Sequence, residues 1–216
     1  EHADHAVSAA YDRVAELNHL FSDYETDSEI NELTRSDAGA KVEVSDDLWK
    51  VLVLSQNLAT NSGGAFDITV GPCVSLWRKA RREKELPETD RLERARERTG
   101  FKKLKLHPNS HSVTLERGDM RLDLGGIAKG YAADEALKIL KQHGITRALV
   151  AASGDLAIGN PPPNEQGWLI DLIGSDIPGA PASFQAELSN VGVATSGDLS
   201  QRLEIGGVRY SHILNP

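Results

Sequence analysis

The segment Arg121-Leu-Asp-Leu-Gly-Gly-Ile-Ala-Lys-Gly-Tyr-Ala-Ala-Asp134 carries residues suited to binding phosphate. A strand is expected to end at Leu124, three glycines follow within six residues, and a helix begins. Glycines let a backbone approach a ligand because no Cβ is in the way. A helix N-terminus offers free N–H groups and a positive dipole end, and Lys129 adds a positive charge there. The combination predicts a pyrophosphate site, and a purely structural corner is the alternative.

This glycine corner differs from the two common nucleotide fingerprints. The Walker A pattern Gly-x-x-x-x-Gly-Lys-Ser/Thr and the Rossmann pattern Gly-x-Gly-x-x-Gly are both absent from the chain. The corner is therefore not evidence for a P-loop enzyme or for a dinucleotide-binding Rossmann domain.

Two other segments have the composition of ligand loops. Gly63-Gly64-Ala65-Phe66-Asp67 places an aromatic ring and a carboxylate beside a glycine pair, and Ala194-Thr195-Ser196-Gly197-Asp198 is a small polar loop after an apolar stretch. The alternatives are structural: a core position for Phe66, a turn cap for Asp67, and a plain turn at the second loop.

Among the seven histidines, His212 stands apart because it follows an expected strand in Tyr210-Ser-His-Ile-Leu-Asn-Pro216. It could accept a proton from a hydroxyl nucleophile or contact a ligand, and the alternative is a hydrogen-bonded histidine at a strand end. No pair of histidines has the His-Glu-x-x-His spacing of a helical zinc site.

Composition narrows the class of protein. A net charge of -8 argues against a nucleic-acid groove, which needs a basic surface. The single cysteine, Cys73, excludes an intramolecular disulfide, and no run of about 18 apolar residues is present to span a membrane. A length of 216 residues fits one domain or a domain with lobes.

The elements that must position these residues follow from the apolar pattern. Apolar residues at helical spacing predict a helix over 7–21, a capping box of Thr26 and Glu29 predicts a short one, and Ser45 caps a third that ends at Gly63-Gly64. A further helix is expected over 131–143. Strands are expected over 65–70, 101–106, 113–115, 120–124, 147–152, 168–173, 183–188, 191–195 and 202–213. Two hairpin turns are expected among them, one around Pro108-Asn109 and one at Gly206-Gly207. Because helices come first and antiparallel strands dominate later, the predicted class is α+β.

Residues 78–98 are dense in charge, with Arg78, Lys79, Arg81 and Arg82 followed by a second group from Arg91 to Arg98. Solvated helices with mixed-sign faces are the favoured interpretation, because such surfaces are common. A patch that binds an anion or a partner is the alternative.

In this order, the segments resemble the ApbE family of FAD:protein FMN transferases. The matching motifs are Phe21-Ser-Asp-Tyr-Glu-Thr-Asp-Ser-Glu-Ile-Asn31, Gly64-Ala-Phe-Asp-Ile-Thr-Val-Gly-Pro72, Asp123-Leu-Gly-Gly-Ile-Ala-Lys-Gly-Tyr-Ala-Ala-Asp134, Ser153-Gly-Asp155, Thr195-Ser-Gly-Asp198 and His212-Ile-Leu-Asn-Pro216. Each motif alone is weakly specific, whereas their succession from residue 21 to the last residue is very specific.

The resemblance implies an α+β fold related to the T-fold and an enzyme that binds FAD and Mg²⁺. Such enzymes split the FAD pyrophosphate and move FMN onto a Thr or Ser hydroxyl of a target protein, such as a subunit of an electron-transfer complex. Many members are exported and lipid-anchored outside the bacterial inner membrane, so a periplasmic location is implied as well.

The same resemblance assigns roles to individual residues. Contacts to FAD are implied for Tyr24, Ala65, Phe66, Asp67, Asp123, Lys129 and Ile213. The backbone carbonyl of Gly126 matches a metal ligand, which suits Mg²⁺ because that ion prefers oxygen. His212, beside Ile213, is the candidate catalytic residue.

The chain also departs from the family pattern. Asn215 stands where Asp is usual, and the Asp and Thr that bind metal in the family would follow Pro216. The chain is therefore expected to be a fragment, cut at both ends and inactive as given. Two alternatives to transfer remain open: a FAD-binding protein or pyrophosphatase without transfer activity, and a structural domain whose glycine corners are only turns.

Overall fold

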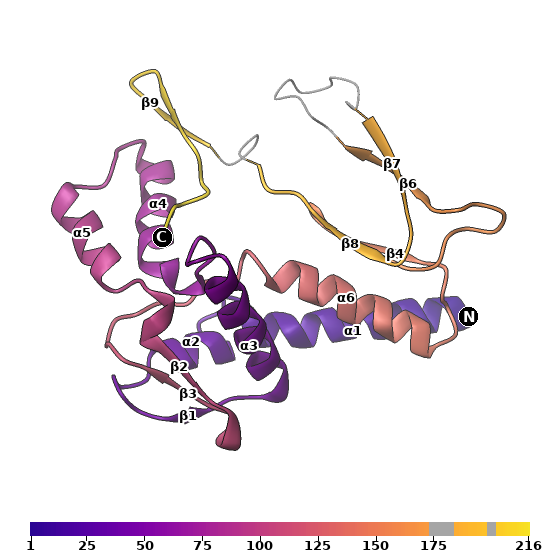
Figure 1. Cartoon of the computed structure of the whole chain (residues 1–216), viewed down its shortest axis with the longest axis horizontal. Helices are drawn as coiled ribbons and strands as arrows, with labels where there is room; N and C mark the ends of the chain where they lie inside the picture. The colour runs from indigo at the N-terminus through magenta and orange to yellow at the C-terminus, as the bar shows by residue number, and fades with distance from the viewer. Residues whose placement is uncertain (173–183, 198–201) are drawn as a thin grey trace. The chain divides into compact units, whose positions relative to one another are not determined.

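Helix α1 (His2–Phe21) opens the chain (Figure 1). Its residues are shared between the two units into which the protein divides. The computed structural model describes residues 1–172, 184–197 and 202–216. The first unit comprises Glu1–Glu16 and Lys129–Leu199, and the second comprises Leu17–Ala128 and Ser200–Pro216. The strands predicted over 168–173 and 183–188 lie partly outside the described residues, at positions 173 and 183.

The first unit packs two helices and a sheet. Helix α6 (Ala128–Gln142) lies against α1 through Ala6, Ala10, Ala136 and Leu140. The other side of α6 packs Ala133 and Leu137 on a sheet of β4 (Leu149–Ala152), β5 (Asp155–Ile158) and β8 (Val191–Ala194), whose three strands are antiparallel in the order β4-β5-β8. Strands β6 (Trp168–Leu172) and β7 (Phe184–Leu188) form a separate antiparallel pair.

The second unit surrounds a small sheet with helices. Strands β1 (Val42–Glu43), β3 (Ser112–Leu115) and β2 (Leu104–His107) are antiparallel in the order β1-β3-β2. The helices are α2 (Glu29–Thr34), α3 (Asp46–Asn61), α4 (Gly71–Glu83) and α5 (Thr89–Glu97), with short 3-10 turns at Ile68–Val70, Phe101–Lys103 and Pro108–Ser110. A hairpin of β9 (Leu203–Ile205) and β10 (Val208–Tyr210) turns at Gly206-Gly207.

The predicted α+β class is confirmed, and so are the helix after the glycine corner, the hairpin around Pro108-Asn109 and the hairpin at Gly206-Gly207. Ser45 caps α3 as predicted, since its side chain accepts a hydrogen bond from the N–H of Leu48. Among the described residues, no helix combines the length and the apolar composition that crossing a membrane requires.

The strand predicted over 65–70 is wrong. Asp67 starts a 3-10 turn over Ile68–Val70, and Gly71-Pro72 begins helix α4 instead of closing a strand. Proline suits the first turn of a helix because its missing N–H has no partner there anyway. Gly71 is required by packing, since a Cβ there would lie 2.4 Å from the carbonyl oxygen of Arg121.

The strand predicted over 120–124 does not form either, although the segment keeps the alternation that suggested it. Met120, Leu122 and Leu124 are buried, and the N–H of Asp123 donates to the carbonyl of Ile68 at 2.7 Å. One such bond anchors the segment without making a ladder.

The capping box of Thr26 and Glu29 is also wrong. Helix α2 has Ser28 as its N-cap, and the Glu29 carboxylate accepts hydrogen bonds from the N–H and the hydroxyl of Ser45, both at 2.5 Å. A tertiary contact to the next helix has replaced the local one.

Candidate functional site

Arg78 on α4 brings together two of the segments that the sequence singled out. Its guanidinium donates to the carboxylate of Asp23 and, at 3.0 Å, to that of Asp123. It also lies over the ring of Tyr24, 4.6 Å from the ring centre, in a cation–π contact. Asp23, Tyr24, Arg78 and Asp123 are called the Arg78 cluster below.

The Asp123 carboxylate is fixed from two sides. One oxygen pairs with Arg78, and the other accepts the N–H of Gly125 at 2.8 Å. A Cβ at Gly125 would lie 2.9 Å from that second oxygen, so the tight turn needs a glycine.

Burial raises the pKa of Asp123 above 3.8, and the charge of Asp23 adds to the rise. The Gly125 N–H, Arg78 and Arg121 act in the opposite direction without cancelling it. The site therefore holds a carboxylate that is partly shielded from water and close to a cation.

Tyr24 is 77% exposed, although Arg78 covers one side of its ring. The exposed remainder of the ring is available to stack on a planar ligand. Arg78 holds the Tyr24 ring, and two carboxylates hold Arg78. The Tyr24 ring is therefore an ordered surface.

The Gly63–Asp67 loop is shaped by the carboxylate of Asp67. That side chain is buried and accepts hydrogen bonds from the N–H and hydroxyl of Thr69, both at 2.7 Å, and from the N–H of Phe101 at 2.8 Å. Asp67 thus has the capping role that was one of its two predicted roles. Its predicted contact with FAD stays a prediction.

Ala65 and Phe66 lie beside this cap. Ala65 is exposed and Phe66 is half-buried. The ring of Phe66 lies so close to Gly126 that a Cβ there would be 3.2 Å from it. The Gly63–Asp67 loop therefore meets the glycine corner.

The N–H groups of Ile127 and Ala128 both donate to the carbonyl of Leu124, and no backbone hydrogen bond to the Gly126 carbonyl is found among the described residues. The residue is exposed, so its oxygen is available to a hard cation. Within the described ranges, no group of three or more His, Cys, Asp or Glu side chains is arranged to hold a metal ion.

Lys129 lies in the first unit, near the start of α6. Its amino group is 3.9 Å from the carboxylate of Asp155, the first residue of β5. The Ser153–Asp155 motif contacts the Thr195 loop, since the N–H of Thr195 donates to the carbonyl of Gly154 at 3.1 Å. Asp198, the last residue of that loop motif, lies outside the described residues.

His212 and Ile213 follow the β9–β10 hairpin in the second unit. The Nδ1 atom of His212 is buried and has no hydrogen-bond partner among the described residues, while Ile213 is 54% exposed. Tyr210 on β10 contacts Trp77, the neighbour of Arg78 on α4, edge to face at 6.0 Å between ring centres. This contact connects the hairpin before His212 to the helix that carries Arg78.

Sequence reasoning missed Arg78 and Asp23 as members of a site. Arg78 was grouped with a charged surface, and its acidic partners are distant in the chain. The available signal was Gly71-Pro72, which begins helix α4. That helix carries both Arg78 and Gly71, which packs against Arg121 in the 120–124 segment.

Comparison with known proteins identifies the family. The FAD:protein FMN transferase of Escherichia coli (strain K12) is 28% identical over 203 residues, covering 91% of this chain and 57% of the relative. That of Treponema pallidum (strain Nichols) is 30% identical over 203 residues, with 88% and 56% covered. The chain thus spans a little more than half the length of these curated relatives.

Solved structures agree with the sequence relatives. The ApbE protein of Thermotoga maritima has a TM-score of 0.88 at 29% identity, covering 98% of this chain and 68% of its own. The flavinyl transferase ApbE of Pseudomonas stutzeri, in its apo form, has a TM-score of 0.84 at 27% identity, with 98% and 66% covered. The model of the ApbE family matches residues 2–216, and the chain therefore belongs to the ApbE family.

Proposed function

We propose that this protein is a FAD:protein FMN transferase, which moves FMN from FAD onto a Thr or Ser hydroxyl of an acceptor protein with the help of Mg²⁺. The observation that carries the proposal is the Arg78 cluster, in which a cation joins Tyr24 to Asp123 in a chain of the ApbE family. Relatives named FAD:protein FMN transferase support it.

The residues fit a flavin nucleotide in their chemistry. Tyr24, Phe66 and Ile213 offer exposed or half-exposed apolar surface for an isoalloxazine or adenine ring. Asp23, Arg78 and Asp123 together carry one net negative charge, so the free acceptor capacity of Asp123 suits hydroxyl or N–H donors of FAD rather than its phosphates. Lys129, at the start of a helix, suits the pyrophosphate.

Asp67 and Ala65 have complementary parts in the proposal. Because three hydrogen bonds hold the carboxylate of Asp67, it keeps the loop in shape, and the exposed Ala65 and the ring of Phe66 provide surface for FAD. Binding of FAD to this loop therefore depends on Asp67, even though the Asp67 carboxylate already accepts three hydrogen bonds from the protein.

The Gly126 carbonyl would be one ligand of Mg²⁺, and its lack of a backbone partner among the described residues supports this assignment. When bound, the ion withdraws charge from the phosphoryl group that is attacked. The bond that forms joins the acceptor hydroxyl oxygen to the phosphorus of the FMN part. The bond that breaks joins that phosphorus to the bridging oxygen, and AMP leaves.

His212 is the proposed acceptor of the proton that the attacking hydroxyl releases. The support is its buried Nδ1, which has no partner among the described residues and which a hydroxyl group would satisfy. The edge-to-face contact between Tyr210 and Trp77 holds the hairpin that precedes His212 against α4. We also propose an acceptor in an electron-transfer complex and a location outside the bacterial inner membrane, in line with the family resemblance.

The test is to incubate the natural full-length protein with FAD, Mg²⁺ and a Thr-containing acceptor and to analyse both products. FMN on the acceptor together with AMP in equal amount supports transfer, and an acceptor with Thr replaced by Val is the control. Free FMN with an unmodified acceptor would instead show a FAD pyrophosphatase. FAD that binds and stays intact would show a flavin-binding protein.

A further inference from the structure

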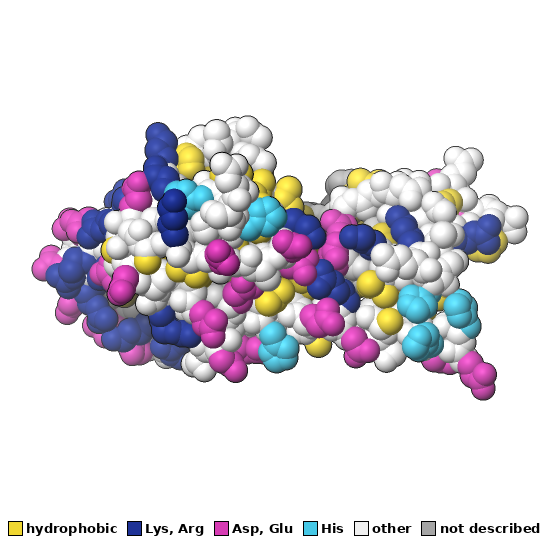
Figure 2. Space-filling model, turned by 90° about the horizontal axis from the view of Figure 1, so that it is seen from below, with side chains coloured by type: hydrophobic (Ala, Val, Ile, Leu, Met, Phe, Trp, Pro, Cys, Tyr) yellow, Lys and Arg dark blue, Asp and Glu magenta, His cyan; other side chains and the backbone are white. Residues whose placement is uncertain are grey.

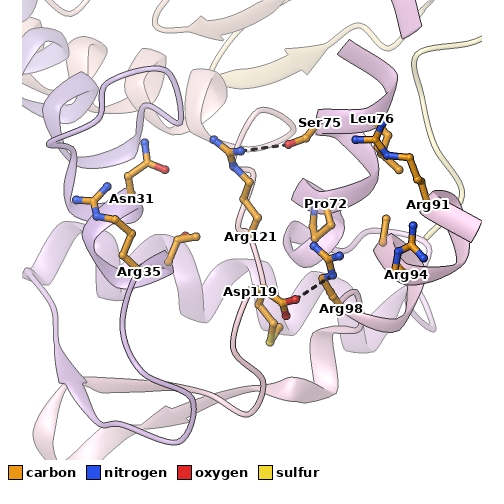
Figure 3. A pocket seen from close by; sticks show the side chains of 13 residues that line it. Asn31, Arg35, Pro72, Ser75, Leu76, Arg91, Arg94, Arg98, Asp119 and Arg121 are labelled. Carbon is orange, nitrogen blue, oxygen red and sulfur yellow. Dashed lines mark hydrogen bonds and ion pairs between the residues drawn. The ribbon is translucent and has the colours of Figure 1, made fainter. Parts of the chain in front are cut away.

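The second unit contains a hollow of about 700 Å³ that the flavin proposal does not use (Figure 3). It is formed by α2, α4, α5 and the segment from Asp119 to Arg121. Five arginines line it: Arg35, Arg91, Arg94, Arg98 and Arg121. We call this feature the arginine hollow. Its lining includes none of Tyr24, Arg78 and Asp123.

The charge of the arginine hollow opposes that of the protein. Five arginines face a single acidic residue, Asp119, in a chain whose net charge is -8. Figure 2 shows Lys and Arg side chains interspersed with Asp and Glu side chains over the part of the second unit that carries α4 and α5, so the excess of positive charge belongs to the lining of the hollow. A concave set of like charges focuses a positive potential and attracts anions, whatever the sign of the whole molecule.

Several donors in the hollow have no protein acceptor. Arg98 pairs with Asp119 at 3.1 Å, Arg121 donates to Ser75 at 3.4 Å, and Arg35 donates to the carbonyl of Thr26 at 2.7 Å. The side chains of Arg91 and Arg94 make no hydrogen bond or ion pair with the described residues. The hydroxyl of Thr34, which also lines the hollow, is buried and unpartnered among those residues. Buried polar atoms are normally hydrogen-bonded, so a ligand in the hollow would supply the partner that the Thr34 hydroxyl lacks.

The arrangement of these donors suits phosphate better than carboxylate. Figure 3 shows Arg35 and Asn31 on one side of the hollow, the arginines of α5 on the opposite side, and Arg121 between them. A bidentate guanidinium occupies one edge of a planar carboxylate, whereas a tetrahedral phosphate offers oxygens to donors that approach from several directions. The volume is in the range of small-molecule sites, roughly 300–1,000 Å³.

We propose that the arginine hollow is a second ligand site, which binds the phosphate groups of a small phosphorylated molecule. Its lining, drawn from the described residues, has no aromatic side chain to stack on a base, so the phosphates rather than a nucleobase are recognised. The proposal goes beyond the transferase function and does not depend on it, because no residue of the Arg78 cluster lines the hollow.

Isothermal titration calorimetry with inorganic pyrophosphate tests the proposal, in the presence of saturating FAD so that the flavin site is occupied. The test variant is Arg91→Gln with Arg94→Gln, two exposed side chains without partners among the described residues. The matched control is Arg82→Gln with Arg96→Gln, which removes the same charge from exposed positions of α4 and α5 outside the hollow. Thermal melting by circular dichroism checks that all three proteins fold.

The expected result is one saturable site in the unmodified protein, weakened about tenfold or more in the test variant and less than about twofold in the control. Absence of saturable binding, or equal weakening in both variants, would overturn the proposal. So would citrate that binds as tightly as pyrophosphate, or ADP that binds more tightly, since these results require carboxylate or base recognition. Failure of FAD to bind counts only against the transferase function, because the variants can be compared without it.

Discussion

The guanidinium of Arg78 lies 3.0 Å from the carboxylate of Asp123 and also holds Asp23, so a single cation on α4 connects the Tyr24 segment to the glycine corner. Neither acidic residue is close to Arg78 in the chain, and both are shielded, with side chains 12% and 11% exposed. This connection makes the two segments one surface.

Asp123→Ala is expected to weaken FAD binding more than it weakens the fold. The change removes the hydrogen bond to the Gly125 N–H, and a lost cap of this kind costs about 1 kcal/mol. Asp123→Asn keeps an oxygen for that N–H and removes the charge, so it should retain the turn. Calorimetric FAD affinity is compared with the melting temperature of the apo protein. A large loss of apo stability with unchanged affinity for FAD would assign Asp123 to the fold alone.

The stability of the protein should depend on the titration of Asp123. Because its pKa in the folded state is raised above 3.8, the folded protein holds this proton more tightly than the unfolded chain. The unfolding free energy should therefore fall, for this group, as the pH rises from 3.8 through the folded pKa, and stay lowered above it. Urea unfolding of the unmodified protein and of Asp123→Asn measures the difference. If the unfolding free energy of the unmodified protein rose relative to that of the variant over this pH range, the predicted sign would be wrong.

Lys129→Ala should weaken FAD binding and leave riboflavin binding nearly unchanged. Riboflavin has no phosphate, and the loss of an exposed charge contact is about 0.5–1 kcal/mol, with more in a desolvated site. Lys138→Ala on the same helix is the control, since its amino group pairs with Glu135. Fluorescence titration with both flavins gives the comparison. Equal losses for FAD and riboflavin would rule out a pyrophosphate role for Lys129.

Two glycines near the corner should respond differently to alanine. A Cβ at Gly126 would lie 3.2 Å from the Phe66 ring, whereas a Cβ at Gly130 meets nothing within 4 Å. Gly130→Ala on α6 should raise the unfolding free energy by about 0.5 kcal/mol, because Ala loses less backbone entropy in a helix. Gly126→Ala should displace Phe66 and weaken FAD binding. Stabilisation by both changes, with unaltered FAD affinity, would mean that the contact between Phe66 and Gly126 is not needed.

Much of the helical framework could be predicted from the sequence, because its signals are local. Each signal acts over a few residues, as in the apolar repeat of α1 and the cap at Ser45. The hairpin turn at Gly206-Gly207 could be predicted for the same reason. The strands expected over 65–70 and 120–124 failed for a different reason. Their apolar pattern reports burial, and burial here comes from packing beside α4 with a single backbone bond from Asp123 to Ile68.

The sequence predicts most residues of the candidate site, but it does not predict the contacts between them. Tyr24, Phe66, Asp123 and Gly126 were singled out, and the structure brings Phe66 to Gly126 and joins Tyr24 to Asp123. Arg78, which makes the second connection, was placed on a solvated surface, because nothing within a helical turn of it distinguishes it from the charges that follow. Long-range ion pairs of this kind have no local signature.

The most direct test of the central claim, that the Arg78 cluster binds FAD, is the FAD affinity of Arg78→Ala measured against Arg82→Ala. Arg82 is on the same helix and exposed, so its loss leaves the cluster intact. Removing Arg78 leaves two shielded carboxylates without their cation and frees the Tyr24 ring. Since hydrogen bonds to charged groups are worth about 1.5–3 kcal/mol, FAD affinity should fall about tenfold or more. Arg82→Ala should bind FAD as the unmodified protein does. Equal FAD affinity in both variants, with both folded, would contradict the claim.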